Sequence, residues 1–331
     1  MPVKITIIGL GQVGASIGLA LAAHKDKVVT TGHDKDYGIE QRAKKLSVVK
    51  ETNHHLRSSV EFADLVILAL PVNEIRDTFG YIALDLKKDA VVVDTSPVKV
   101  EVAKWAQGIL PQTAHYVGVV PAIGPAYLDL TGTGLDSAKA DLFKKGIFLL
   151  STPSGTPGAA VNLVSDLISL LGSTTIMTDF VESDGLMASA YILPHLASVA
   201  LLNATIHQPG WAEVKKSAGR EYFSGISAFS DSSVEGLAML SAQDRENVIR
   251  SLNALMNALL DLRDDLENED HDSLFKRLKS AKEGRENWLA EREKADWSRM
   301  PGEKVDCTQK APGAIPRLHS AISCAAKSTA S

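Results

Sequence analysis

The fold is decided by residues 3–24, VKITIIGLGQVGASIGLALAAH, where a strand pattern changes to a helical pattern at a group of glycines. Residues 3–8 are mostly β-branched or apolar, and a G-x-G-x-x-G sequence follows them directly. Gly9 permits a tight turn, Gly11 lets the backbone approach a pyrophosphate, and Gly14 lets the helix pack closely on the strand. Because the first N–H groups of the helix would face the phosphates, this order predicts a dinucleotide cradle. Its expected cofactor-binding residues are Gly9, Leu10, Gly11, Gln12, Val13 and Gly14.

An acidic residue stands where the second strand of such a cradle would end. Residues 27–34, KVVTTGHD, end in Asp34, twenty positions after Gly14. A carboxylate there can bind the ribose hydroxyls of the adenosine and would repel the 2′-phosphate of NADP. We therefore expect NAD as the cofactor, with NADP possible because the neighbouring His33 and Lys35 would soften that repulsion.

Further apolar runs follow at residues 63–71, 90–96, 115–121 and 147–153. Continuous apolar runs are typical of strands covered on both faces, and helical patterns lie between the early ones. This favours an α/β fold with a Rossmann-type, doubly wound parallel sheet. Ligands of such sheets lie at the carboxyl ends of the strands, so we expect Leu70, Pro71, Asp94 and the loop after Pro121 near the nicotinamide half of the cofactor.

Strand patterns stop near residue 179, and helical patterns follow. We expect a dinucleotide-binding domain at 1–179, an all-α substrate and dimerisation domain at 180–298, and a flexible tail at 299–331. The apolar stripe of residues 243–266 predicts a buried helix face, and a homodimer through the helical domain is expected. Residues 185–206 approach the length of a bilayer span, but Pro194 and His195 favour a buried core helix and no membrane.

Composition narrows the class of ligand. The net charge of −5 disfavours nucleic acid binding, which depends on Lys and Arg neutralising phosphates, so we expect a small-molecule substrate. The two cysteines, Cys307 and Cys324, cannot supply a disulfide framework or a metal cluster, and no metal site is expected. The first two dozen residues superficially imitate a secretion signal, but their glycine spacing fits the cradle better, which favours a cytoplasmic protein.

Four motifs occur in one order: the glycine-rich cradle, DTSPVK at 94–99, VVPAIGPAY at 119–127 and LPH at 193–195. Together they resemble the prephenate and arogenate dehydrogenases of tyrosine biosynthesis, over roughly residues 3–260. The resemblance implies an NAD(P)-binding domain joined to a helical dimerisation domain. It also implies oxidation of the substrate at its ring hydroxyl, with hydride transfer to the nicotinamide and loss of carbon dioxide.

The chain departs from the family in the loop at residues 94–99. The family carries D-x-G-S-x-K there, and Asp94 and Lys99 match this pattern. Pro97 stands where the family has a serine, and Ser96 is available one position earlier. The resemblance therefore makes Ser96 and Lys99 candidate catalytic residues. From the residues alone, Asp94 could equally cap the following helix or turn, and Lys99 could be an ordinary lysine on a helix face.

Further departures concern the substrate site. The histidine of the family's H-P-x-x-G motif is replaced by Val120, and S-H-L-P-H keeps only its second histidine, His195. The family's carboxylate-binding arginine would fall near Ser227, and Arg220 is the nearest alternative. The expected substrate-binding residues are therefore His195, Lys99 and Arg220.

His195 is the candidate catalytic base. Pro194 lacks an N–H group, leaves the carbonyl of Ala190 without its helical partner and should kink the helix, turning His195 toward the cleft. An imidazole can accept the hydroxyl proton near neutral pH. Two other functions stay open: a dehydrogenase of the same fold acting on a different hydroxy or imino acid, and a catalytically silent dinucleotide-binding sensor.

Overall fold

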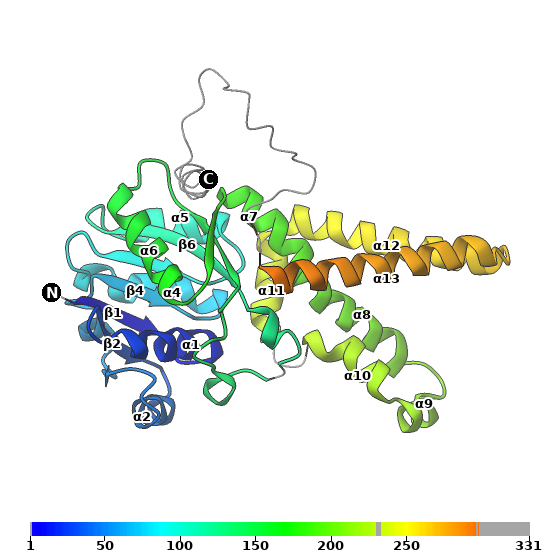
Figure 1. Cartoon of the computed structure of the whole chain (residues 1–331), viewed down its shortest axis with the longest axis horizontal. Helices are drawn as coiled ribbons and strands as arrows, with labels where there is room; N and C mark the ends of the chain where they lie inside the picture. The colour runs from blue at the N-terminus through cyan, green and yellow to red at the C-terminus, as the bar shows by residue number, and fades with distance from the viewer. Residues whose placement is uncertain (1, 131, 230–232, 296, 298–331) are drawn as a thin grey trace, which may run out of the picture. The chain divides into compact units, whose positions relative to one another are not determined.

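The computed structural model describes residues 2–130, 132–229, 233–295 and Trp297. One eight-stranded sheet, in the order β3-β2-β1-β4-β5-β6-β7-β8, forms the first half of the chain (Figure 1). The strands are β1 Val3–Ile8, β2 Val28–His33, β3 Glu51–Thr52, β4 Leu65–Leu68, β5 Val91–Asp94, β6 His115–Ala122, β7 Ile147–Ser151 and β8 Thr174–Met177. The predicted α/β class is confirmed.

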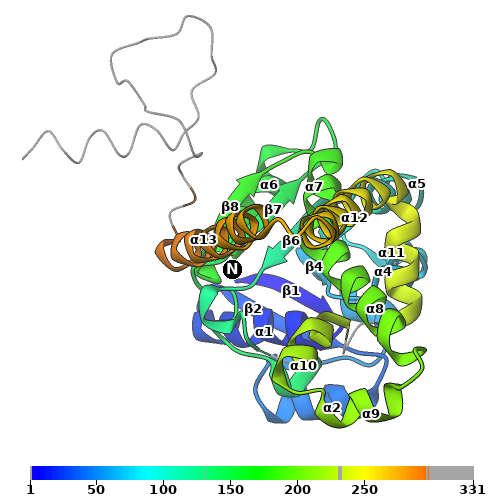
Figure 2. The same cartoon turned by 90° about the vertical axis from the view of Figure 1, so that its right-hand side faces the viewer.

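Helices cover both faces of this sheet, as Figure 2 shows. Neighbouring residues of β1 point to opposite sides: Ile7 belongs to the apolar cluster that includes Ile17 and Ile168, and Ile8 to the cluster that includes Phe79 and Val102. This alternation follows from the two-residue period of a strand. The helices of this region are α1 Gln12–Leu21, α2 Tyr37–Lys45, α3 Leu56–Val60, α4 Val72–Ile82, α5 Val100–Ile109 and α6 Gly158–Leu170.

The described sheet is parallel, as predicted, except at one pair of strands. β6 and β7 are antiparallel, with Val120 opposite Leu149. In the described residues of their connection, 123–130 and 132–146, the helical elements are short 3-10 turns, Pro125–Tyr127 and Leu135–Ser137, and an antiparallel partner needs no helical crossover. An apolar run shows that a strand is buried but not its direction.

The second half of the described chain is helical. Asp184 of α7 contacts the backbone of Lys99 just beyond β5, so this region adjoins the carboxyl ends of the strands (Figure 1). Residues 1–295 form one compact unit, and a boundary at 179/180 stays a prediction. The expected tail at 299–331 lies outside the described residues. The elements are α7 Phe180–Met187, a π-helical turn Ala188–Ile192, α8 Leu193–Ile206, α9 Trp211–Ser217, α10 Arg220–Ile226, α11 Val234–Gln243, α12 Arg245–Glu267 and α13 His271–Lys294.

The expected burial of two apolar segments is wrong for the single chain. On α12 only Val248 is buried, while Met256 and Leu259 are more than half exposed. The segment Phe180–Ile206 has a mean hydropathy of 1.6 with 17% of its most apolar window buried, and by length and composition alone it is able to cross a membrane. α12 is exposed because it projects beyond the sheet with α13 as an antiparallel pair (Figure 1).

Candidate functional site

The glycine turn has the shape that a pyrophosphate requires. Gly9 has a φ of 90°, and a Cβ there would lie 2.4 Å from the carbonyl oxygen of Ala69. A Cβ on Gly14 would lie 2.0 Å from the oxygen of Gly9, whereas a Cβ on Gly11 would meet nothing within 4 Å. Gly11 precedes α1, whose start has no side-chain cap. The open space at Gly11 and the uncapped N–H groups of α1 therefore fit a phosphate.

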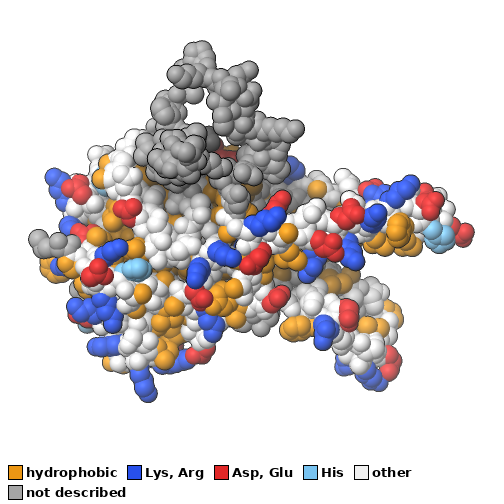
Figure 3. Space-filling model, viewed as in Figure 1, with side chains coloured by type: hydrophobic (Ala, Val, Ile, Leu, Met, Phe, Trp, Pro, Cys, Tyr) orange, Lys and Arg blue, Asp and Glu red, His pale blue; other side chains and the backbone are white. Residues whose placement is uncertain are grey.

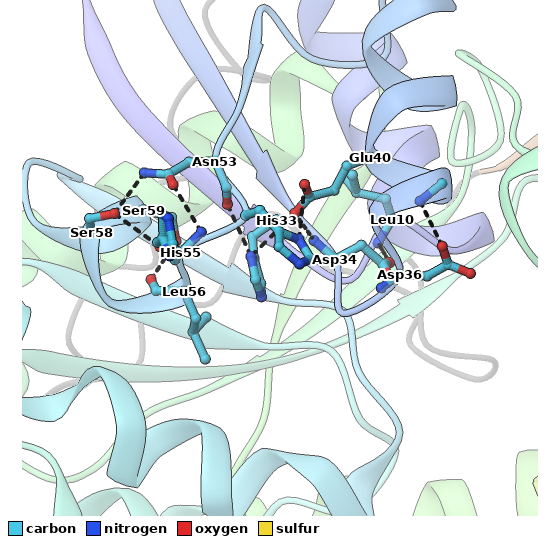
Figure 4. Close-up of polar contacts among 12 residues, drawn as sticks. Leu10, His33, Asp34, Asp36, Glu40, Asn53, His55, Leu56, Ser58 and Ser59 are labelled. Atoms are coloured by element: carbon cyan, nitrogen blue, oxygen red, sulfur yellow. Dashed lines mark hydrogen bonds and ion pairs between the residues drawn. The ribbon is translucent and has the colours of Figure 1, made fainter.

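Asp34 follows β2 directly and is tied to the cradle. One carboxylate oxygen accepts a hydrogen bond of 2.8 Å from the N–H of Leu10, and the other accepts one of 3.0 Å from the N–H of Asp36 (Figure 4). The neighbouring ammonium of Lys35 forms an ion pair of 2.7 Å with Glu74 rather than with Asp34. The charge that would have favoured NADP is thus compensated, and the geometry favours NAD.

Leu70 and Pro71 lie where strand β4 passes into α4. Pro71 caps the start of α4, and the side chain of Leu70 comes within 2.9 Å of the position a Cβ on Gly9 would take. Leu70 therefore adjoins the glycine turn, and Pro71 follows it in the chain at the start of α4.

The loop between β6 and β7 covers α1, which the sequence did not indicate. Gln12 donates a hydrogen bond of 3.2 Å from its side chain to the carbonyl of Gly132, and the hydroxyl of Ser16 accepts one of 3.0 Å from the N–H of Lys139. This loop was expected near the nicotinamide, yet these contacts attach part of it to the helix of the cradle. The partners are more than a hundred residues apart, and no local pattern records them.

The D-T-S-P-V-K loop folds around a buried ion pair. The ammonium of Lys99 lies 2.6 Å from the carboxylate of Asp94, and both side chains are fully buried. Ser96 donates to the same carboxylate oxygen at 2.5 Å, and the hydroxyl of Tyr116 donates to the other at 2.6 Å. Burial lowers the pKa of Lys99, and Asp94 opposes this effect; burial and Asp94 both raise the pKa of Tyr116.

This arrangement changes the role expected for Lys99. The structure brings Asp94, Ser96 and Lys99 together, but a fully buried ammonium has no surface with which to contact a substrate. The geometry favours Lys99 as a residue that holds Asp94 in place. Asp94 also accepts a hydrogen bond from the N–H of Ser96, so it closes the turn, one of the alternatives left by the sequence.

The helix that follows this loop is capped from the helical region. Asp184 of α7 accepts hydrogen bonds from the N–H groups of Lys99 and Val100, the first turn of α5. Burial raises the pKa of Asp184 to about 6, and the nearby charge of Asp244 adds to this shift. No sequence motif indicated Asp184, because the interaction joins residues far apart in the chain.

The helix of His195 departs from α geometry where the proline suggested. The N–H of Leu193 bonds to the carbonyl of Ala188, which makes residues 188–192 a π-helical turn before Pro194. The Nδ1 atom of His195 lies 2.7 Å from the carbonyl oxygen of Tyr191. Because a carbonyl only accepts, Nδ1 carries a hydrogen, and Nε2 of the neutral ring has a lone pair for a substrate hydroxyl.

The position of His195 follows from its neighbours. Ile192 is fully buried in the apolar cluster that also contains Leu68 and Val72, at the end of β4. His195 is three residues further along and lies on the same side of the helix.

Val120 lies on the face of β6 that carries Tyr116, because side chains two apart in a strand share a face. The approach of His195 to the nicotinamide stays a prediction.

Arg220 and Ser227 lie at the two ends of α10. This helix packs on α8, since Ser198 donates a hydrogen bond of 2.9 Å to the carbonyl of Gly225. Arg220 is exposed at the first position of α10, and Ser227 follows its last residue and donates to the carbonyl of Phe223. Carboxylate binding by Arg220 stays a prediction.

The sequence is similar to that of known dehydrogenases. Residues 17–177 match the family model of the prephenate dehydrogenase nucleotide-binding domain. The chain is 31% identical to cyclohexadienyl dehydrogenase of Zymomonas mobilis over 201 residues, which are 60% of this chain and 66%, slightly less than two thirds, of that protein. It is 24% identical to prephenate dehydrogenase of Bacillus subtilis over 283 residues, 85% of this chain and 75% of that one.

Solved structures show the same fold. A prephenate dehydrogenase from A. aeolicus, in complex with hydroxyphenyl propionate and NAD+, superposes with a TM-score of 0.77 at 21% identity, covering 87% of this chain and 98% of that one. Arogenate dehydrogenase from Synechocystis gives 0.68 at 20% identity, covering 86% and 99%. Together with the glycine cradle and Asp34, these matches show that residues 17–177 are similar to the nucleotide-binding domain of prephenate dehydrogenases, which are NAD-dependent oxidoreductases.

Proposed function

We propose that the protein catalyses the NAD-dependent oxidative decarboxylation of prephenate or arogenate. The single observation that carries this proposal is the Asp34 carboxylate, fixed by the N–H of Leu10 beside a cradle whose Gly11 leaves room for a pyrophosphate. In this frame Asp34 binds the adenosine ribose, and the start of α1 binds the pyrophosphate. The bound nicotinamide supplies the hydride acceptor.

His195 is the proposed base. Its Nε2 atom is free to accept a hydrogen bond because Nδ1 is committed to the carbonyl of Tyr191. As the ring C–H bond breaks and the carbonyl forms, the hydroxyl proton moves to Nε2. The bond to the ring carboxylate then breaks, carbon dioxide leaves, and the proton returns to the phenolic oxygen. Ser96 and Lys99 serve this step by fixing Asp94 and the loop at the edge of the site, and Arg220 is the proposed partner of a substrate carboxylate.

The test is a nicotinamide-reduction assay with prephenate and with arogenate, each against NAD and NADP. Reduction of NAD with at least one of the two substrates is expected. No reduction with either substrate would refute the assignment, and NADH binding without turnover would then favour a sensor.

A second candidate is a dehydrogenase acting on a different hydroxy or imino acid. It is favoured by Val120, a buried apolar side chain at the position where the family carries a catalytic histidine. Reduction of NAD with other cyclic or linear hydroxy acids, combined with inactivity toward prephenate and arogenate, would select this candidate.

We further propose a cytoplasmic homodimer formed through the helical region, without a membrane or nucleic acid partner. The proposal is supported by large apolar side chains that the single chain leaves exposed on this region, whereas Figure 3 shows Lys, Arg, Asp and Glu interspersed along the visible side of α13. A second copy would cover the apolar faces of Phe180–Ile206 and α12 without a bilayer. The apolar N-terminal run forms strand β1, paired on both sides, which supports a cytoplasmic location over a secretion signal. The exposed side chains include Leu186, Leu201, Ile249, Met256, Leu259, Leu260, Leu266, Phe275, Leu278 and Trp288.

A further inference from the structure

Two histidines and a glutamate lie close together at the end of β2. His33 is the last residue of β2, Glu40 lies in the first turn of α2, and His54 lies in the loop between β3 and α3. Nδ1 of His33 is 3.3 Å from one oxygen of Glu40, and Nδ1 of His54 is 3.2 Å from the other. The three candidate ligand atoms all lie within 4.8 Å of one another.

We propose that His33, Glu40 and His54 form a binding site for a divalent ion of the zinc class. Two imidazoles and one carboxylate are a ligand set that zinc uses when a fourth position stays open. With bonds of about 2.0–2.1 Å to a tetrahedral ion, neighbouring ligand atoms lie about 3.3 Å apart. Nδ1 of His33 and the Glu40 oxygen beside it, 3.3 Å apart, match this spacing, and Nδ1 of His54 lies 3.2 Å from the other oxygen of the same carboxylate.

Burial and accessibility support the same inference. The side chain of Glu40 is 1% exposed, and a carboxylate at such a position calls for a partner that compensates its charge. The side chain of His54 is 46% exposed, which gives an ion a path from solvent. The neighbouring ammonium of Lys35 is paired with Glu74 and so does not compete for Glu40.

The groups around the cluster orient its ligands. The N–H of Asp34 donates a hydrogen bond of 2.9 Å to the Glu40 oxygen that faces His33, and such outer contacts fix metal-binding carboxylates (Figure 4). In the ion-free chain the carbonyl oxygen of Asn53 accepts a hydrogen bond of 3.0 Å from Nδ1 of His33, so this hydrogen has to move to Nε2 when Nδ1 binds an ion. One ligand of the ion, His33, would be the residue directly before Asp34, the proposed ribose-binding residue.

The sequence predicted no metal site, because the three ligands of this site do not form a compact sequence motif. Residues 33 and 40 lie in β2 and α2, and residue 54 lies in the loop after β3, which the pairing of β2 with β3 brings close to the other two.

The test measures zinc binding and needs no enzymatic activity, so its outcome is separate from that of the proposed function. Calorimetric titration with zinc chloride is carried out on the untagged full chain carrying Cys307→Ser and Cys324→Ser, which removes the thiols as competing ligands. This parent is compared with His54→Ala and with His55→Ala, a neighbouring exposed histidine outside the cluster, and magnesium chloride serves as the probe for non-selective cation binding.

The parent and His55→Ala should each bind one zinc ion, and His54→Ala should bind it at least about tenfold more weakly because one of three ligands is lost. Thermal unfolding without metal is measured for both variants, because His54→Ala also removes the contacts of His54 with Glu40 and Tyr37. The proposal is overturned if the parent shows no saturable one-to-one binding, if magnesium binds as well as zinc, or if His54→Ala and His55→Ala bind zinc equally.

Discussion

The carboxylate of Asp184 accepts a hydrogen bond of 2.5 Å from the backbone N–H of Lys99. A residue of the helical region thereby caps the helix that begins at the end of the D-T-S-P-V-K loop. The contact couples the two halves of the molecule at the edge of the site.

The first prediction concerns the pH dependence of this contact. The pKa of Asp184 is raised from 3.8 to about 6, mainly by burial, so the folded protein binds a proton more tightly than the unfolded chain. Between about pH 4 and pH 6 this group therefore makes the free energy of unfolding fall as the pH rises. Asp184→Asn should flatten that decline in urea titrations at pH 4, 5, 6 and 7.

Asp26→Asn is the matched control, because Asp26 is exposed and lies far along the chain from α5. Its pH profile should follow that of the parent. A profile for Asp184→Asn that is indistinguishable from both would show that the pKa of Asp184 is not raised in the folded protein.

The second prediction concerns cofactor choice. Asp34→Asn keeps an oxygen that accepts from the N–H of Leu10 but removes the charge that disfavours a 2′-phosphate. The KM for NAD should rise about tenfold, equivalent to about 1.4 kcal/mol, and the KM for NADP should fall. Steady-state kinetics with both cofactors measure this, and an unchanged ratio of the two KM values would contradict the assigned role of Asp34.

The third prediction separates two glycines of the cradle. A methyl group at Gly11 meets no protein atom, so Gly11→Ala should fold with nearly unchanged thermal stability and lose NADH binding by obstructing the pyrophosphate. A methyl group at Gly14 would collide with the carbonyl oxygen of Gly9, so Gly14→Ala should lower the melting temperature markedly. Thermal unfolding and NADH fluorescence titration test both statements; full NADH affinity in Gly11→Ala would argue against the cradle.

The sequence predicted the parts of the site that depend on local chemistry. The glycine turn, Asp34 and the strand ends are recorded in contiguous motifs, and the structure brings together Asp94, Ser96 and Lys99, all from the loop that the resemblance singled out. The burial of Lys99 was not predictable, because it depends on Tyr116 and Asp184, which reach the loop from other elements. The direction of β7 was missed for a similar reason, since strand pairing is not encoded in an apolar run.

The fourth prediction tests the dimer. Leu259 of α12 is 56% exposed in the single chain, so Leu259→Glu should disrupt an interface formed there and yield monomers in light scattering after size exclusion. Leu84, which is 89% exposed on the sheet half, provides the control: Leu84→Glu should leave the mass unchanged. A monomeric parent, or a dimeric Leu259→Glu variant, would remove α12 from the proposed interface.

The role of His195 needs a control histidine. His115 begins β6, at the end of the strand away from Val120 and the carboxyl edge, and its Nε2 atom lies 3.8 Å from Asp89. His115→Gln should therefore retain the activity of the parent, as well as its affinity for NADH.

The most direct test of His195 as the base is kcat for His195→Gln with prephenate or arogenate, whichever the parent oxidises, at saturating NAD. Loss of a general base predicts a fall in kcat of roughly 10²–10⁴-fold with NADH binding unchanged. A kcat equal to that of the parent and of His115→Gln would contradict this role, because the imidazole of His195 would then take no part in the chemistry.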